Sequence, residues 1–318
     1  MRPPTDIALQ GPPPPVKRRG CFSNISFGRK IMKESLSAII NRIQDKLIPE
    51  IQDFIEECKK RIDPTSPDSC FDCIDIVRGI IDSGALSRQV NAYLLTMMDG
   101  GSRESFVSDG TMLLYFQGGF SVTVTKIQRR PAHIYLHPTH LLGSSIGRNT
   151  IRLHRYNVDP IPDNHVFSPE HRVIKTQCVD LERGDVFMRN GHHECLDYEA
   201  VDGKPALLFR LISTNVGALE WAFDRDSGRP WNVMAVNPVS SKLCSVMNVL
   251  AALGSSTSVE PLDALTNHPD HFVRWKALQT IAEISPETAA SIIGRFEDDP
   301  HPHVRAAARK TIENMKVA

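Results

Sequence analysis

The chain has 318 residues, of which 41% are hydrophobic and 23% are charged, which is enough apolar content for more than one domain with its own core. Basic and acidic residues number 37 each, so no global electrostatic field would gather nucleic acid or acidic lipid. The seven cysteines are scattered and odd in number, and no run of 18 apolar residues or signal-peptide core is present. We therefore expect a cytoplasmic protein with no membrane partner and no nucleic-acid partner.

The N-terminal third divides into a tail and a helical region. Residues 1–27 are rich in proline and are predicted to be a disordered tail, and residues 28–104 are predicted to be helical. An apolar residue recurs every four positions at Ile39, Ile43, Leu47, Ile51 and Ile55. Because Pro49 interrupts this stripe, we expect either two helices that meet near Leu47–Pro49 or one kinked helix.

Two further helices are predicted at about Phe71–Asp82 and Ser87–Met98, each ended by glycine. A Cys-x-x-Cys motif, Cys70 to Cys73, lies at the start of the first of them. A zinc site would need a second ligand pair and a thioredoxin-type motif would need a βαβ context. Neither is found nearby, so we interpret these cysteines as core residues.

Residues 105–238 are predicted to form an antiparallel sandwich or barrel. The hydrophobic period changes to two here, and the Asp109-Gly110 pair is typical of a tight hairpin turn. Eight short strands without intervening helices are predicted. They are Met112–Phe116, Phe120–Ile127, His133–His137, Thr150–Asn157, Arg172–Leu181, Val186–Arg189, Ala206–Ser213 and Leu219–Phe223. Trp231 follows them, and we expect it to seal the barrel or the domain contact.

Residues 239–318 contain an internal repeat. The segment around Val273-Arg274 is echoed around Val304-Arg305, 31 residues later. Both copies resemble the second helix of HEAT repeats, which implies stacked helical hairpins that can dock a protein partner. The resemblance implies that the apolar positions of both copies are buried, namely Val273, Ala277, Ile281, Val304, Ala308 and Ile312.

Eight of the twelve histidines lie between His133 and His193. The run Gly184-Asp185 to Gly191-His192-His193 resembles the second cupin motif, although the usual proline before the last glycine is absent. The pair His137 and His140, followed by Gly147 with no glutamate between, is a weaker match to the first cupin motif. His165, followed by Glu170 and His171, is the alternative to that pair.

The cupin resemblance implies an α+β chain, with N-terminal helices, an antiparallel cupin-like β-barrel and C-terminal HEAT-like α-hairpins. It also implies a divalent transition metal, with Fe(II) as the expected ion, held by three histidines. The candidate ligands are His137, His140 and either His193, which we prefer, or His192; consecutive strand residues face opposite ways, so only one of the last two can point inward. Arg210 and Tyr156 are the candidate catalytic residues that would orient a substrate. For an anionic substrate, Arg152 is the alternative to Tyr156.

Two functional hypotheses follow. The first is a metal-dependent cupin-type enzyme, a non-haem iron oxygenase acting on a small polar molecule. The alternative is a non-catalytic ligand-binding or regulatory protein whose HEAT-like hairpins dock a protein partner. Metal content after purification distinguishes the two hypotheses.

Overall fold

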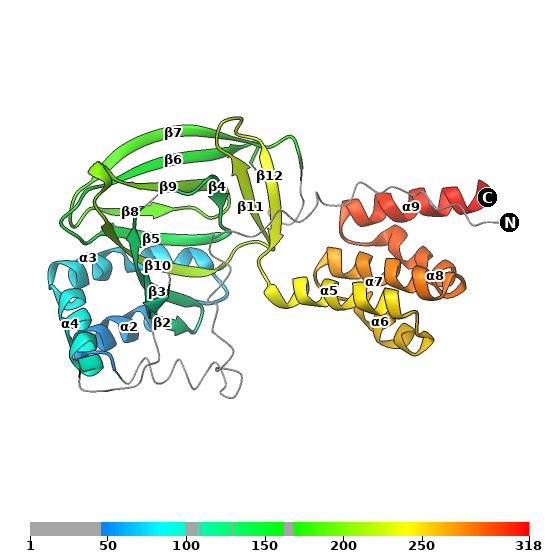
Figure 1. Ribbon diagram of the computed structural model, residues 1–318, viewed down its shortest axis with the longest axis horizontal. Helices are drawn as coiled ribbons and strands as arrows, with labels where there is room; N and C mark the ends of the chain where they lie inside the picture. Colours follow the sequence, from blue (N-terminus) through cyan, green and yellow to red (C-terminus); the bar gives the residue numbers. More distant parts are fainter. Residues whose placement is uncertain (1–45, 99–106, 109, 129, 162–167, 318) are drawn as a thin grey trace.

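The computed structural model describes residues 46–98, 107–108, 110–128, 130–161 and 168–317. Figure 1 shows a β-domain with helices packed below it and a second, all-helical unit at its side. The predicted α+β class is confirmed. The predicted tail, residues 1–27, and the stripe residues Ile39 and Ile43 lie outside the described residues. No described helix has both the length and the apolar content that crossing a membrane requires.

The N-terminal helices are α2 (Pro49–Arg61), the 3-10 helix η2 (Pro67–Cys73), α3 (Ile74–Asp82) and α4 (Ala85–Met98). Pro49 opens α2, where its missing N–H costs no helical hydrogen bond, so it starts this helix. The helix predicted at Phe71 instead starts at Ile74, after η2. Cys70 and Cys73 are fully buried in the core, as their interpretation as packing residues predicts.

The strands form three antiparallel sheets with the orders β1-β2-β3-β10-β5-β8, β12-β11-β4 and β7-β6-β9. Their bounds are β1 Val107–Ser108, β2 Thr111–Gln117, β3 Phe120–Ile127, β4 His133–Leu136, β5 Thr139–Ser145, β6 Ile151–Asp159, β7 Arg172–Leu181, β8 Val186–Arg189, β9 Glu194–Ala200, β10 Ala206–Asn215, β11 Leu219–Asp224 and β12 Pro230–Ala235. The eight predicted strands are all present, within two residues at each end. Among the described residues, no strand pairing closes the three sheets into one barrel.

Two cores lie on opposite faces of the six-stranded sheet. One face packs against the N-terminal helices, through residues such as Val122, Leu142 and Phe209. The other face packs toward the β7-β6-β9 sheet, through residues such as Leu141, Phe187 and Leu208. We call this second core the β-domain interior. Side chains alternate between the two faces along each strand, so neighbouring residues of β5 and β8 enter different cores.

The helical unit consists of α5 (Pro238–Leu253), α6 (Val259–Leu265), α7 (His271–Ile284), α8 (Pro286–Ile292) and α9 (Pro302–Val317), with 3-10 turns η4 (Ser256–Ser258) and η5 (Ile293–Asp298). It has a hydrophobic core of its own. Five of the six residues predicted to be buried have at most 3% of their surface exposed, and Ile312 is partly buried. Within residues 238–317 the structure contains helix and turn but no strand, as the repeat predicts.

A stacked histidine pair in this unit predicts a pH-dependent stability. The rings of His271 and His301 lie 3.5 Å apart at 3°, and burial, helped by nearby His301 and Arg274, lowers the pKa of His271 to about 4. Unfolded histidine titrates near 6.5, so between these values the unfolded chain binds a proton that the folded chain does not. The stability of the helical unit should therefore be complete above about pH 6.5 and fall toward pH 4.

This pH dependence can be measured by thermal melts followed by far-UV circular dichroism. His271→Phe keeps an aromatic ring against His301 but cannot titrate, so its melting temperature should fall less than that of the wild type on acidification. An identical pH slope in the two proteins would show that His271 is not responsible.

Trp231 does not seal a core, in contrast to the expectation from sequence. It belongs to β12, is 40% exposed and stacks on His133 with 4.0 Å between ring centroids. The side chain therefore covers the outside of the β12-β11-β4 sheet. Trp231→Ala should destabilise the β-domain by about 1 kcal/mol, the usual contribution of an aromatic pair, and lower the melting temperature by a few degrees. A melting temperature equal to that of the wild type would show that the stacking contributes no stability.

Candidate functional site

The four predicted metal ligands do not lie at one point. His137 follows β4, and its Nδ1 lies 2.9 Å from Oε2 of Glu220 on β11. Both side chains of this pair reach solvent, with 36% and 25% of their surfaces exposed. His137 thus has a carboxylate partner where the sequence predicted a shared metal ion.

His140 lies on the face of β5 opposite to the β-domain interior. Thr139 and Leu141 flank it on the interior face, so alternation turns His140 toward the N-terminal helices. Its ring centroid is 5.0 Å from that of Phe71, and its Nδ1 accepts a hydrogen bond of 3.2 Å from the backbone N–H of Gly191. The ring is fully buried, and burial lowers its pKa. His140, a predicted metal ligand, therefore points away from the β-domain interior and toward the N-terminal helices.

The turn between β8 and β9 brings His192, rather than the preferred His193, to His140. The His140 and His192 ring centroids are 5.3 Å apart. Gly191 allows this approach, because a Cβ there would overlap the backbone of Thr139. His193 contributes its backbone carbonyl, which accepts a 2.9 Å hydrogen bond from Val158 N–H.

The alternative histidine pair is not brought together either. His165 lies outside the described residues, and His171 is buried with its ring 4.9 Å from that of Trp221. Throughout the described part of the chain, no three His, Cys, Asp or Glu side chains are arranged to share a metal ion. The donor set around His140 therefore does not fit a three-histidine cupin centre.

Tyr156 and Arg210 lie in different cores. Tyr156 lies in the cluster around Trp221, where its hydroxyl accepts a 3.0 Å hydrogen bond from Arg130 Nη2. Arg152, the alternative to Tyr156, pairs with Asp180 at the surface. Arg210 lies in the β-domain interior, two residues after Leu208 on β10. The two predicted catalytic residues therefore cannot act on one substrate together.

The β-domain interior contains a second arginine, Arg189, which sequence reasoning did not select. It lies on β8 two residues after the interior residue Phe187 and is only 4% exposed. Its Nη2 donates to the carbonyl and hydroxyl oxygens of Thr139, at 2.6 and 2.7 Å. Its Nε is buried and has no hydrogen-bond acceptor among the described residues. Arg189 is thus a buried cation whose direct partners are neutral.

Arg210 lies in the same interior. Its Nε donates to Thr123 Oγ1 at 3.2 Å and its Nη2 to Thr125 Oγ1 at 2.5 Å. Burial lowers the pKa of both arginines, although a guanidinium stays charged at neutral pH. Burial raises the pKa of Tyr198. The charges of Arg189 and Arg210 both oppose this rise, so the phenol lies within electrostatic range of each.

Two carboxylates act electrostatically on Arg189, those of Glu194 and Glu220, and Glu220 is the one that pairs with His137. Burial would raise the pKa of this carboxyl, but His137 and Arg189 outweigh burial and lower it. Glu220 and Arg189 nevertheless form no ion pair in the described residues. The candidate site is therefore a positive interior made by Arg189 and Arg210, beside Tyr198, with the His137–Glu220 pair nearer to solvent.

Comparison with known proteins supports the resemblance of the C-terminal unit to HEAT repeats. The family of HEAT repeats matches residues 244–313, which identifies the C-terminal unit as HEAT repeats. No curated protein sequence matches the chain at a significant level.

Among solved structures, the chain is similar to the cupin domain of Cnp3 from Schizosaccharomyces pombe, with 9% identity, a TM-score of 0.25, and coverage of 36% of this chain and 69% of that one. It is also similar to hydroquinone 1,2-dioxygenase from Sphingomonas sp. TTNP3, with 13% identity, a TM-score of 0.27, and coverage of 35% and 68%. Hydroquinone 1,2-dioxygenase PnpCD matches with 10% identity and a TM-score of 0.26, over 33% of this chain and 63% of that one. Scores this low carry no argument about ligand or reaction.

Proposed function

We propose that the chain is a binding protein for a small anionic molecule, which the β-domain interior holds at Arg189 and Arg210. The observation that carries this proposal is the buried Nε of Arg189, which has no acceptor among the described residues. Burying a guanidinium without a counter-ion costs several kcal/mol. A carboxylate offsets that cost because its two oxygens match the planar donors of arginine.

The two guanidinium groups of the interior favour an anion as the ligand. Tyr198 adds a phenol that can donate a hydrogen bond to the same ligand. The apolar wall of the interior, including Leu208 and Phe187, suits a ligand that also has a hydrophobic part.

Ligand-dependent thermal stability tests this proposal on the full chain. Acetate, benzoate, succinate and inorganic phosphate serve as probes at constant ionic strength, with chloride as the reference anion. A bound anion should raise the melting temperature of the β-domain, and a hundredfold excess over Kd corresponds to about 2.7 kcal/mol. If none of the carboxylates raises it more than chloride does, the interior is not an anion site.

A metal-dependent enzyme is the second candidate, with an Fe(II) oxygenase as its most specific form. Its starting point is the His140–His192 pair beside Asp68, whose Oδ1 lies 3.0 Å from His140 Nε2, although these three side chains are not arranged to share a metal ion in the described structure. These groups lie between β5, η2 and the β8–β9 turn, outside the β-domain interior. About one equivalent of iron in protein purified without a histidine tag, lost in His140→Ala and kept in His193→Ala, would favour this candidate. Metal-free protein that still binds a carboxylate would exclude it.

A further inference from the structure

The 31-residue repeat places Arg274 on α7 and Arg305 on α9 at equivalent positions. Arg274 Nη1 donates to the carbonyl oxygens of His268 and Pro269, both at 2.8 Å. Arg305 Nη1 donates to the equivalent carbonyls of Asp299 and Pro300, at 2.6 and 2.9 Å. Each arginine is therefore held by its own turn in the same way.

The remaining donors of Arg274 bind the next turn. Its Nε and Nη2 donate to the two carboxylate oxygens of Asp299, at 2.8 and 2.6 Å, and this pair is buried. Asp299 Oδ1 also accepts the backbone N–H of His301, at 2.8 Å, at the start of α9. Arg274 thus binds, through two parallel hydrogen bonds, the aspartate in the turn that leads into α9.

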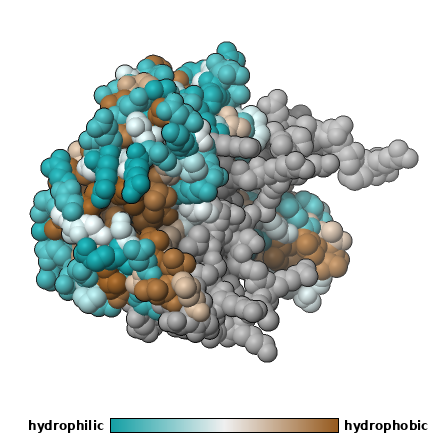
Figure 2. Space-filling view, turned by 60° about the vertical axis from the view of Figure 1, so that its left-hand side comes forward, coloured by the Kyte–Doolittle hydropathy of each residue, from teal (hydrophilic) through white to brown (hydrophobic). Residues whose placement is uncertain are grey.

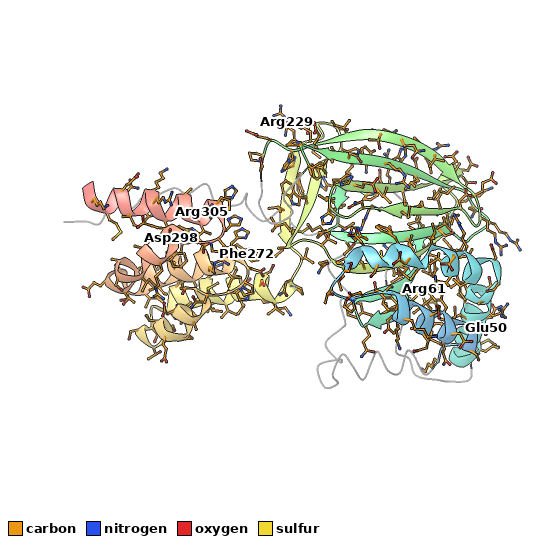
Figure 3. All side chains as sticks on the ribbon, turned by 180° about the vertical axis from the view of Figure 1, so that it is seen from behind. Glu50, Arg61, Arg229, Phe272, Asp298 and Arg305 are labelled. Atoms are coloured by element: carbon orange, nitrogen blue, oxygen red, sulfur yellow. The ribbon has the colours of Figure 1, made fainter. Side chains whose placement is uncertain are left out.

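The corresponding donors of Arg305, Nε and Nη2, make no hydrogen bond within the described structure. The side chain is partly exposed. Figure 3 shows Arg305 on α9 in the helical unit, near the turn that carries Asp298. The recognition geometry seen at Arg274 is therefore repeated at Arg305 without its aspartate.

The surrounding surface favours an acidic partner over an apolar one. The equivalent of Leu278, which is 3% exposed, is Arg309, which is exposed and donates through Nη2 to the Glu297 carbonyl. Lys310 beside it is also exposed, and Glu313 is the acidic exception on this helix. A charged residue, Arg309, thus replaces a buried apolar residue of the preceding repeat, as in a capping repeat.

We infer that this end of the helical unit binds a partner protein through an acidic turn, with an aspartate carboxylate held by Nε and Nη2 of Arg305 as Asp299 is held by Arg274. Arg309 and Lys310 add attraction for acidic neighbours of that aspartate. This interaction surface is separate from the β-domain interior and does not depend on its ligand.

Fluorescence anisotropy with the full chain tests this inference. The probe is a labelled peptide that copies residues 294–303 and thus carries the turn of Asp299; the same peptide with Asn at that position is its control. The wild-type chain should bind the first peptide at least about tenfold more tightly than the second, because the fork needs a carboxylate. Equal binding of the two peptides would overturn the inference. This comparison uses the wild-type chain only.

Two variants locate the binding on the protein. Arg305→Lys keeps the charge but lacks the fork, and it should weaken binding of the Asp peptide about tenfold. Arg295→Gln removes an arginine that is paired with Asp263 in the same unit, and it should leave binding unchanged. Unchanged binding by Arg305→Lys, or Arg305-dependent self-association in analytical ultracentrifugation, would contradict an acidic partner at this surface.

Discussion

Substituting Arg189 by Met is expected to abolish the stabilisation of the β-domain by small carboxylates without destabilising the free protein. Met fills a similar volume but carries no charge, so the cost of the buried guanidinium disappears. The hydrogen bonds to Thr139 are lost, at about 1 kcal/mol each. These effects oppose each other. Without ligand, the free energy of unfolding should therefore either increase or fall by no more than about 1 kcal/mol.

The response to anions separates a binding role from a structural one. Thermal melts with and without succinate or benzoate should show a ligand-dependent shift in the wild type and none in Arg189→Met. Arg152→Met is the matched control, because Arg152 pairs with Asp180 on the exposed side of β6 and should leave the shift intact. A large loss of stability in ligand-free Arg189→Met would mean that Arg189 serves mainly to hold Thr139.

Replacing Asp299 by Asn should destabilise the helical unit by about 3 kcal/mol. The substitution leaves the Arg274 guanidinium, 7% exposed, without its anionic partner, and breaking one side of a buried ion pair typically costs this much. Asn still caps a helix, so the start of α9 keeps its backbone partner. The expected loss therefore measures the charge interaction together with the one Arg274 hydrogen bond that the Asn amide nitrogen cannot accept.

Chemical denaturation followed by circular dichroism measures this loss. Asp263→Asn is the control, because Asp263 pairs with Arg295 at an exposed position and should cost less than about 1 kcal/mol. Burial would raise the pKa of Asp299, but Arg274 outweighs burial and lowers it, so its contribution is present above about pH 4 and is lost in stronger acid. Equal losses in the two variants would contradict the role of the buried pair.

The repeat and most strands could be predicted because their signals are local. The 31-residue offset aligns Val273 with Val304, and both are buried. The strands that were missed have reasons in their residues: β5 ends in Gly143-Ser144-Ser145, which is typical of a turn, and β12 begins with Pro230. Figure 2 shows hydrophobic residues gathered on the surface of the β-domain side. The α4 residues Leu94 and Leu95 are among those left exposed in the described structure.

The site was harder to predict because it depends on which face a residue occupies. His137 and His140 are close in sequence, yet one pairs with Glu220 and the other faces the N-terminal helices. Arg189 and Asn190 precede Gly191, where the second cupin motif usually has a proline, so in the sequence Arg189 marks only a departure from that motif. Its alternation with Phe187, an apolar residue two positions earlier, was the signal that could have placed it in the interior.

A crystal structure with 4-bromobenzoate tests the central claim most directly, because its bromine can be located by anomalous scattering and an aryl bromide does not alkylate the exposed Cys178 thiol. We expect the bromine in the β-domain interior, with a carboxylate oxygen about 2.7–2.9 Å from Arg189 Nε. Arg189→Met crystals treated in the same way should show no bromine there. Bromine only at the molecular surface, or an Arg189 Nε bonded to a protein acceptor, would contradict an anion-binding interior.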